Sequence, residues 1–155
     1  PSGLTTKIKS IDIFQGELEE AFAPQSVALS LEDDIDISRG DLIIKDNGLP
    51  KSSQDIEMMI CWFHEKPMVL GGKYSVKHTT NDLRCVVRDV KYKIDVNTLE
   101  HKEGDKTIGI NDIAKIAIKT TKPLFFDSYR KNRKMGSIIL IDEATNNTVA
   151  AGMIL

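Results

Sequence analysis

Apolar and polar residues alternate along most of this chain, with the period of two that is typical of β-strands. The alternation is clean in Ser26–Leu31, and in Thr5–Ile13 it contains one slip that fits a β-bulge. The apolar run within Asp41–Lys45 also favours a strand, and it is followed by turn-forming residues at 46–50. The pattern therefore predicts three strands ahead of a boundary near residues 46–55.

The same alternation continues beyond this boundary and predicts six more strands. Helical signals are few, and the main one is Gly16–Phe22, which is expected to form a turn of helix. The run Ile138–Ile141 is apolar at every position, which predicts a strand buried on both faces. Because six strands can close a small barrel, the sequence predicts an all-β fold with one complete barrel. The six predicted strands are Ile56–Phe63, Lys73–His78, Leu83–Asp95, Ile113–Thr121, Ser137–Ile141 and Thr148–Leu155.

Composition narrows the class of protein without changing this prediction. The chain has 155 residues, of which 41% are hydrophobic and 28% charged, as in an ordinary globular protein. Its apolar runs are far shorter than the roughly 20 residues that span a bilayer, so no membrane is expected and the cytoplasm is the expected location. The net charge of -2 makes nucleic acid an unfavourable partner, because phosphate binding depends on a basic excess.

A search for catalytic and metal-binding motifs gives negative results. Gly72-Lys73 is followed by Tyr74 and lacks the spacing of a phosphate-binding P-loop. The acidic stretch Glu32–Gly40 superficially resembles a calcium loop, but when the loop is counted from Asp34, Arg39 stands where it needs Gly. The sequence therefore predicts no catalytic, cofactor-binding or metal-binding residue. The three histidines (His64, His78 and His101) and the two cysteines are too scattered to suggest the spacing of metal ligands. Cys61 and Cys85 are expected to be reduced and buried.

One short basic stretch is the candidate functional segment. Its positive charges lie in a predicted loop and are interleaved with a tyrosine and an asparagine. Such a composition suits an acidic partner surface, phosphate or RNA, whereas the simpler interpretation is a solvated loop. The residues predicted to dock a partner are Tyr129, Arg130, Lys131, Arg133 and Lys134.

Several longer segments carry a family resemblance. They include Phe14–Ala23, Leu31–Asp41, Tyr92–Leu99 and Phe126–Ser137, together with the pieces Lys66-Pro67-Met68 and Gly72-Lys73-Tyr74. Together they resemble the large, GTP-binding subunit of bacterial sulfate adenylyltransferase, a GTPase of the translation-factor-like class. The closing Thr148–Met153 is also similar to the end of the barrel domains of elongation factor Tu. The resemblance covers essentially the whole chain.

This resemblance implies a fold and a setting. Residues 1–49 are expected to be the C-terminal part of β-barrel domain two, a partial translation-factor-type barrel. Residues 50–155 are expected to be domain three, a six-stranded Greek-key barrel like the C-terminal domain of elongation factor Tu. The chain lacks an initiator Met and runs directly into a strand-like segment, which indicates part of a longer protein. The three strands of residues 1–49 leave unpaired edges, so the chain is expected to self-associate or to pack this part on the second barrel.

The family's activity also frames the expected role. In such enzymes a small ATP-sulfurylase subunit makes adenosine 5′-phosphosulfate from ATP and sulfate, and the large subunit hydrolyses GTP. GTP and Mg²⁺ belong to a GTPase domain absent from this sequence, so the chain alone is expected to be non-catalytic although its parent is an enzyme. Its expected partners are that GTPase domain and the small subunit. The alternative is a translation-factor-like module that contacts RNA through Tyr129–Lys134.

Overall fold

The computed structural model describes residues 3–45 and 48–155, and the chain divides into two compact units, residues 1–47 and 48–155. Within the described residues the regular structure is ten β-strands and one helix of four residues. This confirms the predicted all-β fold. No helix in the described part of the chain is long and apolar enough to cross a membrane.

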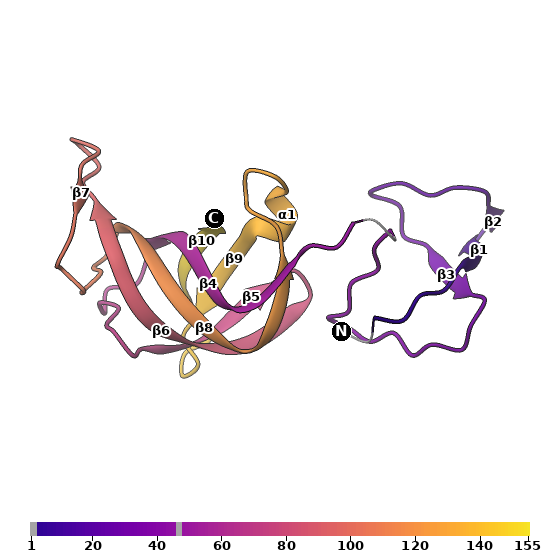
Figure 1. The fold of residues 1–155 in the computed structure, drawn as a ribbon, viewed down its shortest axis with the longest axis horizontal. Coiled ribbons are helices and arrows are strands. Elements are labelled where there is room, and N and C mark those ends of the chain that lie inside the picture. Colours follow the sequence, from indigo (N-terminus) through magenta and orange to yellow (C-terminus); the bar gives the residue numbers. More distant parts are fainter. Residues whose placement is uncertain (1–2, 46–47) are drawn as a thin grey trace. The chain divides into compact units, whose positions relative to one another are not determined.

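Six strands of the second unit form a closed barrel (Figure 1). They are antiparallel and follow the order β5-β9-β10-β4-β8-β6, and the pairing of β5 with β6 closes the ring. This confirms the predicted six-stranded barrel. The strands are β4 (Lys51–Trp62), β5 (Lys73–His78), β6 (Asn81–Ile94), β8 (Ile113–Phe126), β9 (Ser137–Ile141) and β10 (Thr148–Ile154).

Two barrel strands are longer than the sequence predicted. β4 begins at Lys51 and β8 continues to Phe126, and these two residues are paired with each other. The extension is stabilised by backbone hydrogen bonds across a bulge near Ser53, so it does not require an apolar pattern. The segment between the predicted strands Leu83–Asp95 and Ile113–Thr121 also contains a two-residue strand, β7 (His101–Lys102), which pairs with the end of β6.

The barrel interior is filled by alternate side chains of every long strand. Trp62 is 1% exposed, and its ring meets Tyr74 edge to face with centroids 5.5 Å apart. The Trp62 indole nitrogen donates a hydrogen bond to the Lys66 carbonyl at 3.0 Å, which satisfies its polar group. In β9 only Ile138 and Leu140 point into this core, so the prediction that the run is buried on both faces is wrong. The intervening isoleucines are half-buried on the outer face, because consecutive strand residues point to opposite faces.

The first unit is a three-stranded sheet with the order β2-β1-β3. Its strands are β1 (Ile8–Ile13), β2 (Gly16–Leu18) and β3 (Ala28–Leu31). The predicted turn of helix at Gly16–Phe22 is therefore wrong at its start. Ile13 pairs with Gly16 across a two-residue turn, and a hairpin forms in place of a helix.

The predicted strand at Asp41–Lys45 is also absent. These residues pair with no strand among the described residues, and an isolated apolar run has no ladder to hold it extended. The turn predicted over 46–50 includes residues 46 and 47, which lie outside the described residues. Within 3–45 no residue is buried, and Phe14 is fully exposed. The described part of this unit therefore has no core of its own.

Ion pairs with lysines lower the pKa values of two carboxylates in and just after β6. The Lys106 and Lys91 ammonium groups lower the pKa of Asp89 to about 2. Asp95 also has its pKa lowered to about 2, first by Lys102 and then by the backbone N–H groups that follow it. Both carboxylates are therefore more acidic in the folded chain than in the unfolded one.

Removing a core side chain should destabilise the barrel strongly. Leu140 is 1% exposed, so we expect Leu140→Ala to lower the free energy of unfolding by about 2–5 kcal/mol. Leu49→Ala is the matched control, because Leu49 is 77% exposed and its truncation should change stability by less than about 0.5 kcal/mol. Urea unfolding followed by Trp62 fluorescence measures both. Equal losses in the two variants would contradict the assignment of Leu140 to the core.

Acid should weaken the fold in part through Asp89 and Asp95. Because their pKa values fall from 3.8 to about 2 on folding, their stabilisation is present above pH 4 and disappears as the pH falls towards 2. We expect Asp89→Asn/Asp95→Asn to show a smaller fall in Tm between pH 5 and pH 2 than the unaltered chain. Asp34→Asn/Asp36→Asn, at carboxylates without ion pairs among the described residues, should leave the fall unchanged. The same pH profile in both double variants would refute this account.

Candidate docking surface

The basic segment Tyr129–Lys134 has more structure than the predicted loop. It leads into α1 (Arg133–Gly136), a single helical turn immediately before β9 (Figure 1). Asn132 is the N-cap residue, and its side-chain oxygen accepts hydrogen bonds from the backbone N–H groups of Lys134 at 3.1 Å and Met135 at 3.3 Å. The cap explains why the chain turns helical here.

Three contacts anchor this segment to the barrel. The Tyr129 N–H donates to the carbonyl of Ile154 in β10 at 2.8 Å. Gly136 packs so closely on the backbone of Tyr129 that an added Cβ would lie 2.3 Å from the Tyr129 Cα. The third contact comes from His78, whose Nε2 donates to the Met135 carbonyl at 2.8 Å. The segment is therefore held at both of its ends.

His78 is a structural residue, although the sequence suggested no role for it beyond that of a metal ligand, which its spacing disfavours. Its side chain is 1% exposed, and its Nδ1 has no hydrogen-bond partner among the described residues. Since the Nε2 atom faces a carbonyl, Nε2 carries the proton and Nδ1 is an unpaired acceptor. The signal for its burial was present in β5, where Tyr74, Val76 and His78 occupy alternate positions.

The cations of the segment differ in how freely they face the solvent. Lys131 is tied to Asp127 by an ion pair of 2.7 Å. Arg130, Arg133 and Lys134 are exposed, and the structure gives their side chains no ion pair with any described residue. Three positive charges are thus available on a well-anchored turn. Of the five predicted docking residues, Tyr129 alone is half-buried, and it faces an adjoining groove.

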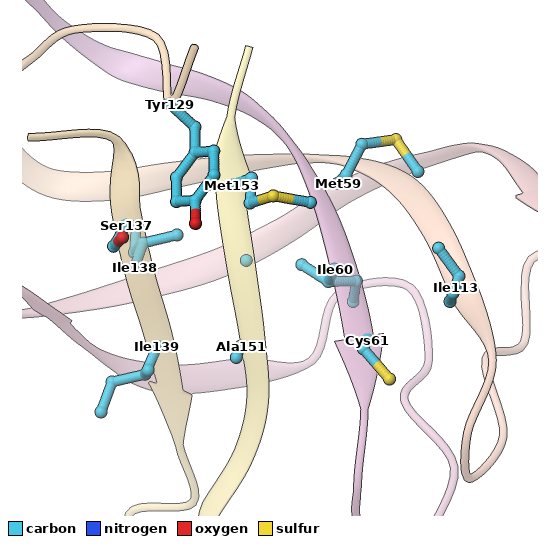
Figure 2. Close-up of a pocket in the computed structure, with 11 residues that line it drawn as sticks. Met59, Ile60, Cys61, Ile113, Tyr129, Ser137, Ile138, Ile139, Ala151 and Met153 are labelled. Atoms are coloured by element: carbon cyan, nitrogen blue, oxygen red, sulfur yellow. The ribbon is translucent and has the colours of Figure 1, made fainter. Parts of the chain in front are cut away.

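This groove runs across the outer face of β9, β10, β4 and β8 and has a volume of about 380 Å³. The strand register places its outward side chains in two rows. Ile139, Ala151, Cys61 and Ile113 form one row. Ser137, Met153 and Met59 form the other, and Figure 2 shows Tyr129 beside this second row, above β9 and β10.

The groove is apolar where an outer barrel face is ordinarily polar. Met153 is 44% exposed, and a small residue, Ala151, leaves the centre of the groove shallow and open. Unbranched methionine side chains adapt to different partner surfaces, which suits Met59 and Met153 to an interface. We call this groove together with Tyr129–Lys134 the docking surface.

The metal-ligand and thiol chemistry of the described residues is limited. No group of three or more His, Cys, Asp or Glu side chains is placed to hold a metal ion within the described ranges. Burial raises the pKa of the Cys85 thiol to about 12, so this cysteine is a poor nucleophile. Cys61 is half-buried in the groove and is also a free thiol, which corrects the prediction that both cysteines are buried.

The sequence could locate the charged half of the docking surface but not the apolar half. Consecutive cations are visible in one segment, whereas the groove combines residues from four strands that are far apart in the chain. A partial signal existed in β9 and β10, where apolar residues occupy both inward and outward positions.

A methyl group at Gly136 should clash with the backbone of Tyr129 and destabilise the fold. Because the added Cβ would meet backbone atoms that cannot rotate away, we expect Gly136→Ala to destabilise the fold by about 3 kcal/mol, the upper end of the cost of overpacking. Gly109→Ala is the control, since its added Cβ would lie 3.6 Å from the Asp112 carboxylate, an ordinary contact. Thermal unfolding compares them, and similar Tm values for the two variants would show that Tyr129 and Gly136 are not packed in this way.

Comparison with solved structures shows the same fold in Sup35. The chain superposes on Sup35 complexed with GMPPNP with a TM-score of 0.87, covering 100% of this chain and 38% of that one at 16% sequence identity. Sup35 complexed with GDP gives a TM-score of 0.84. At this identity the likeness extends to the fold alone.

Relatives found by sequence are much more similar to this chain than the solved structures are. The chain is 48% identical to sulfate adenylyltransferase subunit 1 of Bacteroides fragilis and 46% identical to that of Bacteroides thetaiotaomicron, in each case over 100% of this chain. It is also 46% identical to the bifunctional enzyme CysN/CysC of Rhodopirellula baltica. The chain spans only 32%, 34% and 24% of the lengths of these three relatives, respectively.

The barrel unit also matches a protein-family model. The model described as GTP-eEF1A C-terminal domain-like matches residues 55–155, which are almost the whole barrel. Together with the relatives, this match confirms the resemblance to the large subunit of sulfate adenylyltransferase. The chain therefore belongs to the GTP-eEF1A C-terminal domain-like family and matches the β-barrel part of sulfate adenylyltransferase subunit 1.

Proposed function

We propose that this chain is a non-catalytic β-barrel part of the GTP-hydrolysing subunit of sulfate adenylyltransferase, and that its docking surface binds the ATP-sulfurylase subunit. The observation that carries the proposal is the apolar groove beside three unpaired cations on an anchored turn. In this function GTP and Mg²⁺ bind in a GTPase domain outside the chain, which the barrel supports. Adenosine 5′-phosphosulfate forms in the partner subunit, in the cytoplasm.

The choice of partner follows from the names of the relatives and from the character of the surface. Proteins named subunit 1 belong to an enzyme with at least one further subunit. A partner that stays bound is the best occupant for an exposed apolar groove, because stable interfaces bury an apolar centre and leave a polar rim. In this arrangement Tyr129 and Met153 belong to the centre, and Arg130, Arg133 and Lys134 to the rim.

RNA contact is the second candidate function. The observation in its favour is the exposed Arg130 and Arg133, which precede and follow the N-cap residue Asn132 in the same segment as Tyr129. Against it stands the net charge of -2, which weakens the attraction of phosphate over the whole chain. The apolar groove also offers nothing to a phosphate backbone.

The test measures binding between the full-length subunit that contains this chain and the purified ATP-sulfurylase subunit by titration calorimetry. We expect Met153→Asp to weaken binding at least about tenfold, because it puts a charge in the centre of the interface. Arg130→Ala/Arg133→Ala should weaken it less and reduce its dependence on salt. Val96→Asp is the control, at an apolar residue outside the groove that is 60% exposed, and should bind normally.

The opposite results are equally informative. Unchanged affinity in Met153→Asp, with the variant shown to be folded, would overturn the docking proposal. Salt-sensitive retention of RNA that Arg130→Ala/Arg133→Ala abolishes would favour the second candidate.

A further inference from the structure

A second groove lies on a different part of the barrel, across the outer face of β5, β6 and β8. Its volume is about 370 Å³, and it shares no residue with the docking surface. Four cations line it: Lys73 from β5, Arg84 and Arg88 from β6, and Lys119 from β8. Glu143 is the only carboxylate among the described lining residues.

The strand register sets the spacing of these charges. Val86 is paired with Lys73 on one side and with Lys119 on the other, so the three residues form a row across the strands. With neighbouring strands about 4.8 Å apart, the backbones of the two lysines are about 10 Å apart. Arg84 and Arg88 lie on either side of Val86 along β6, and a bulge between Val87 and Asp89 places Arg88 outside the regular register. The charges therefore surround an apolar centre.

Most of this charge is not neutralised within the chain. Glu143 forms an ion pair of 2.9 Å with Arg84. The side chains of Lys73, Arg88 and Lys119 have no hydrogen bond or ion pair with any residue that the structure describes. Holding like charges on neighbouring strands is unfavourable, and a bound anion would relieve that repulsion. The chain as a whole carries a net charge of -2, whereas this groove carries a net positive charge.

The spacing identifies the chemical class of the anion. The backbones that carry these cations are spread over three strands, so a partner with several negative charges can meet more of them than a single phosphate or carboxylate. An extended peptide carries alternate side chains about 7 Å apart on one face, so successive carboxylates can reach successive cations. Its backbone and small side chains would cover the half-buried Val86 at the centre. A long nucleic acid fits less well, because the acidic remainder of the surface would repel the phosphates beyond the groove.

We propose that the groove between Lys73, Arg84, Arg88 and Lys119 is a binding site for a short, extended, acidic segment of a protein partner. This site is independent of the docking surface, and each can be present without the other. Glu143 acts as an internal competitor, because its carboxylate occupies Arg84 in the free chain.

The experiment uses fluorescence polarisation with a labelled peptide of alternating glutamate and alanine, and with its glutamine counterpart. We expect the glutamate peptide to bind more tightly and to lose affinity steeply with salt. Arg88→Glu/Lys119→Glu should weaken binding at least tenfold, whereas Glu143→Gln should strengthen it severalfold because it frees Arg84. Lys51→Glu/Lys66→Glu is the control, with the same change of net charge outside the groove.

Three outcomes would overturn the proposal. The first is equal affinity for the glutamate and glutamine peptides. The second is an equal loss in the groove variant and the control, which would show that only net charge matters. The third is tighter binding of a labelled single-stranded RNA that the groove variant alone abolishes, which would assign the groove to nucleic acid. Circular dichroism of each variant establishes that it is folded.

Discussion

Closure of the barrel depends on the antiparallel pairing of β10 with β4, which joins the last strand of the second unit to its first. Ile154 at the end of β10 is opposite Met58, and Ala150 is opposite Trp62. Together with the β5–β6 pair, this ladder leaves no long strand of the barrel with an open edge. Once the ring is closed, every residue on these strands must point either into the core or out to the surface.

Both candidate binding surfaces follow from that constraint. In β10, Val149, Ala150 and Ile154 fill the interior, while Met153 is placed outside beside Met59 of β4. In β6, Cys85 and Val87 face inward, which sends Arg84 and Arg88 outward. The two grooves therefore lie on a rigid frame and differ in character: one is apolar with a basic border, and the other is basic with an apolar centre.

The anchoring of Tyr129–Lys134 shows how a surface segment becomes part of this frame. Its entry is hydrogen-bonded to β10 and its exit to β5, through Tyr129 and His78 respectively. The side chain of His78 is thus buried at the cost of an unpaired Nδ1, a cost ordinarily of about 1–3 kcal/mol for a buried polar atom. A fixed segment loses less conformational entropy when a partner binds, and this favours a docking role over that of a mobile solvated loop.

The alternating pattern of the sequence by itself determined the approximate positions of the six barrel strands, because the period of two is a local property of an extended chain. It failed at Gly16–Phe22 and at Asp41–Lys45, where strand formation depended on the presence or absence of a pairing neighbour. The basic residues of Tyr129–Lys134 were also visible locally. Only the tertiary structure brought Met59, Tyr129 and Met153 into one groove and four cations into another, since register across strands is set by barrel closure and not by any single segment.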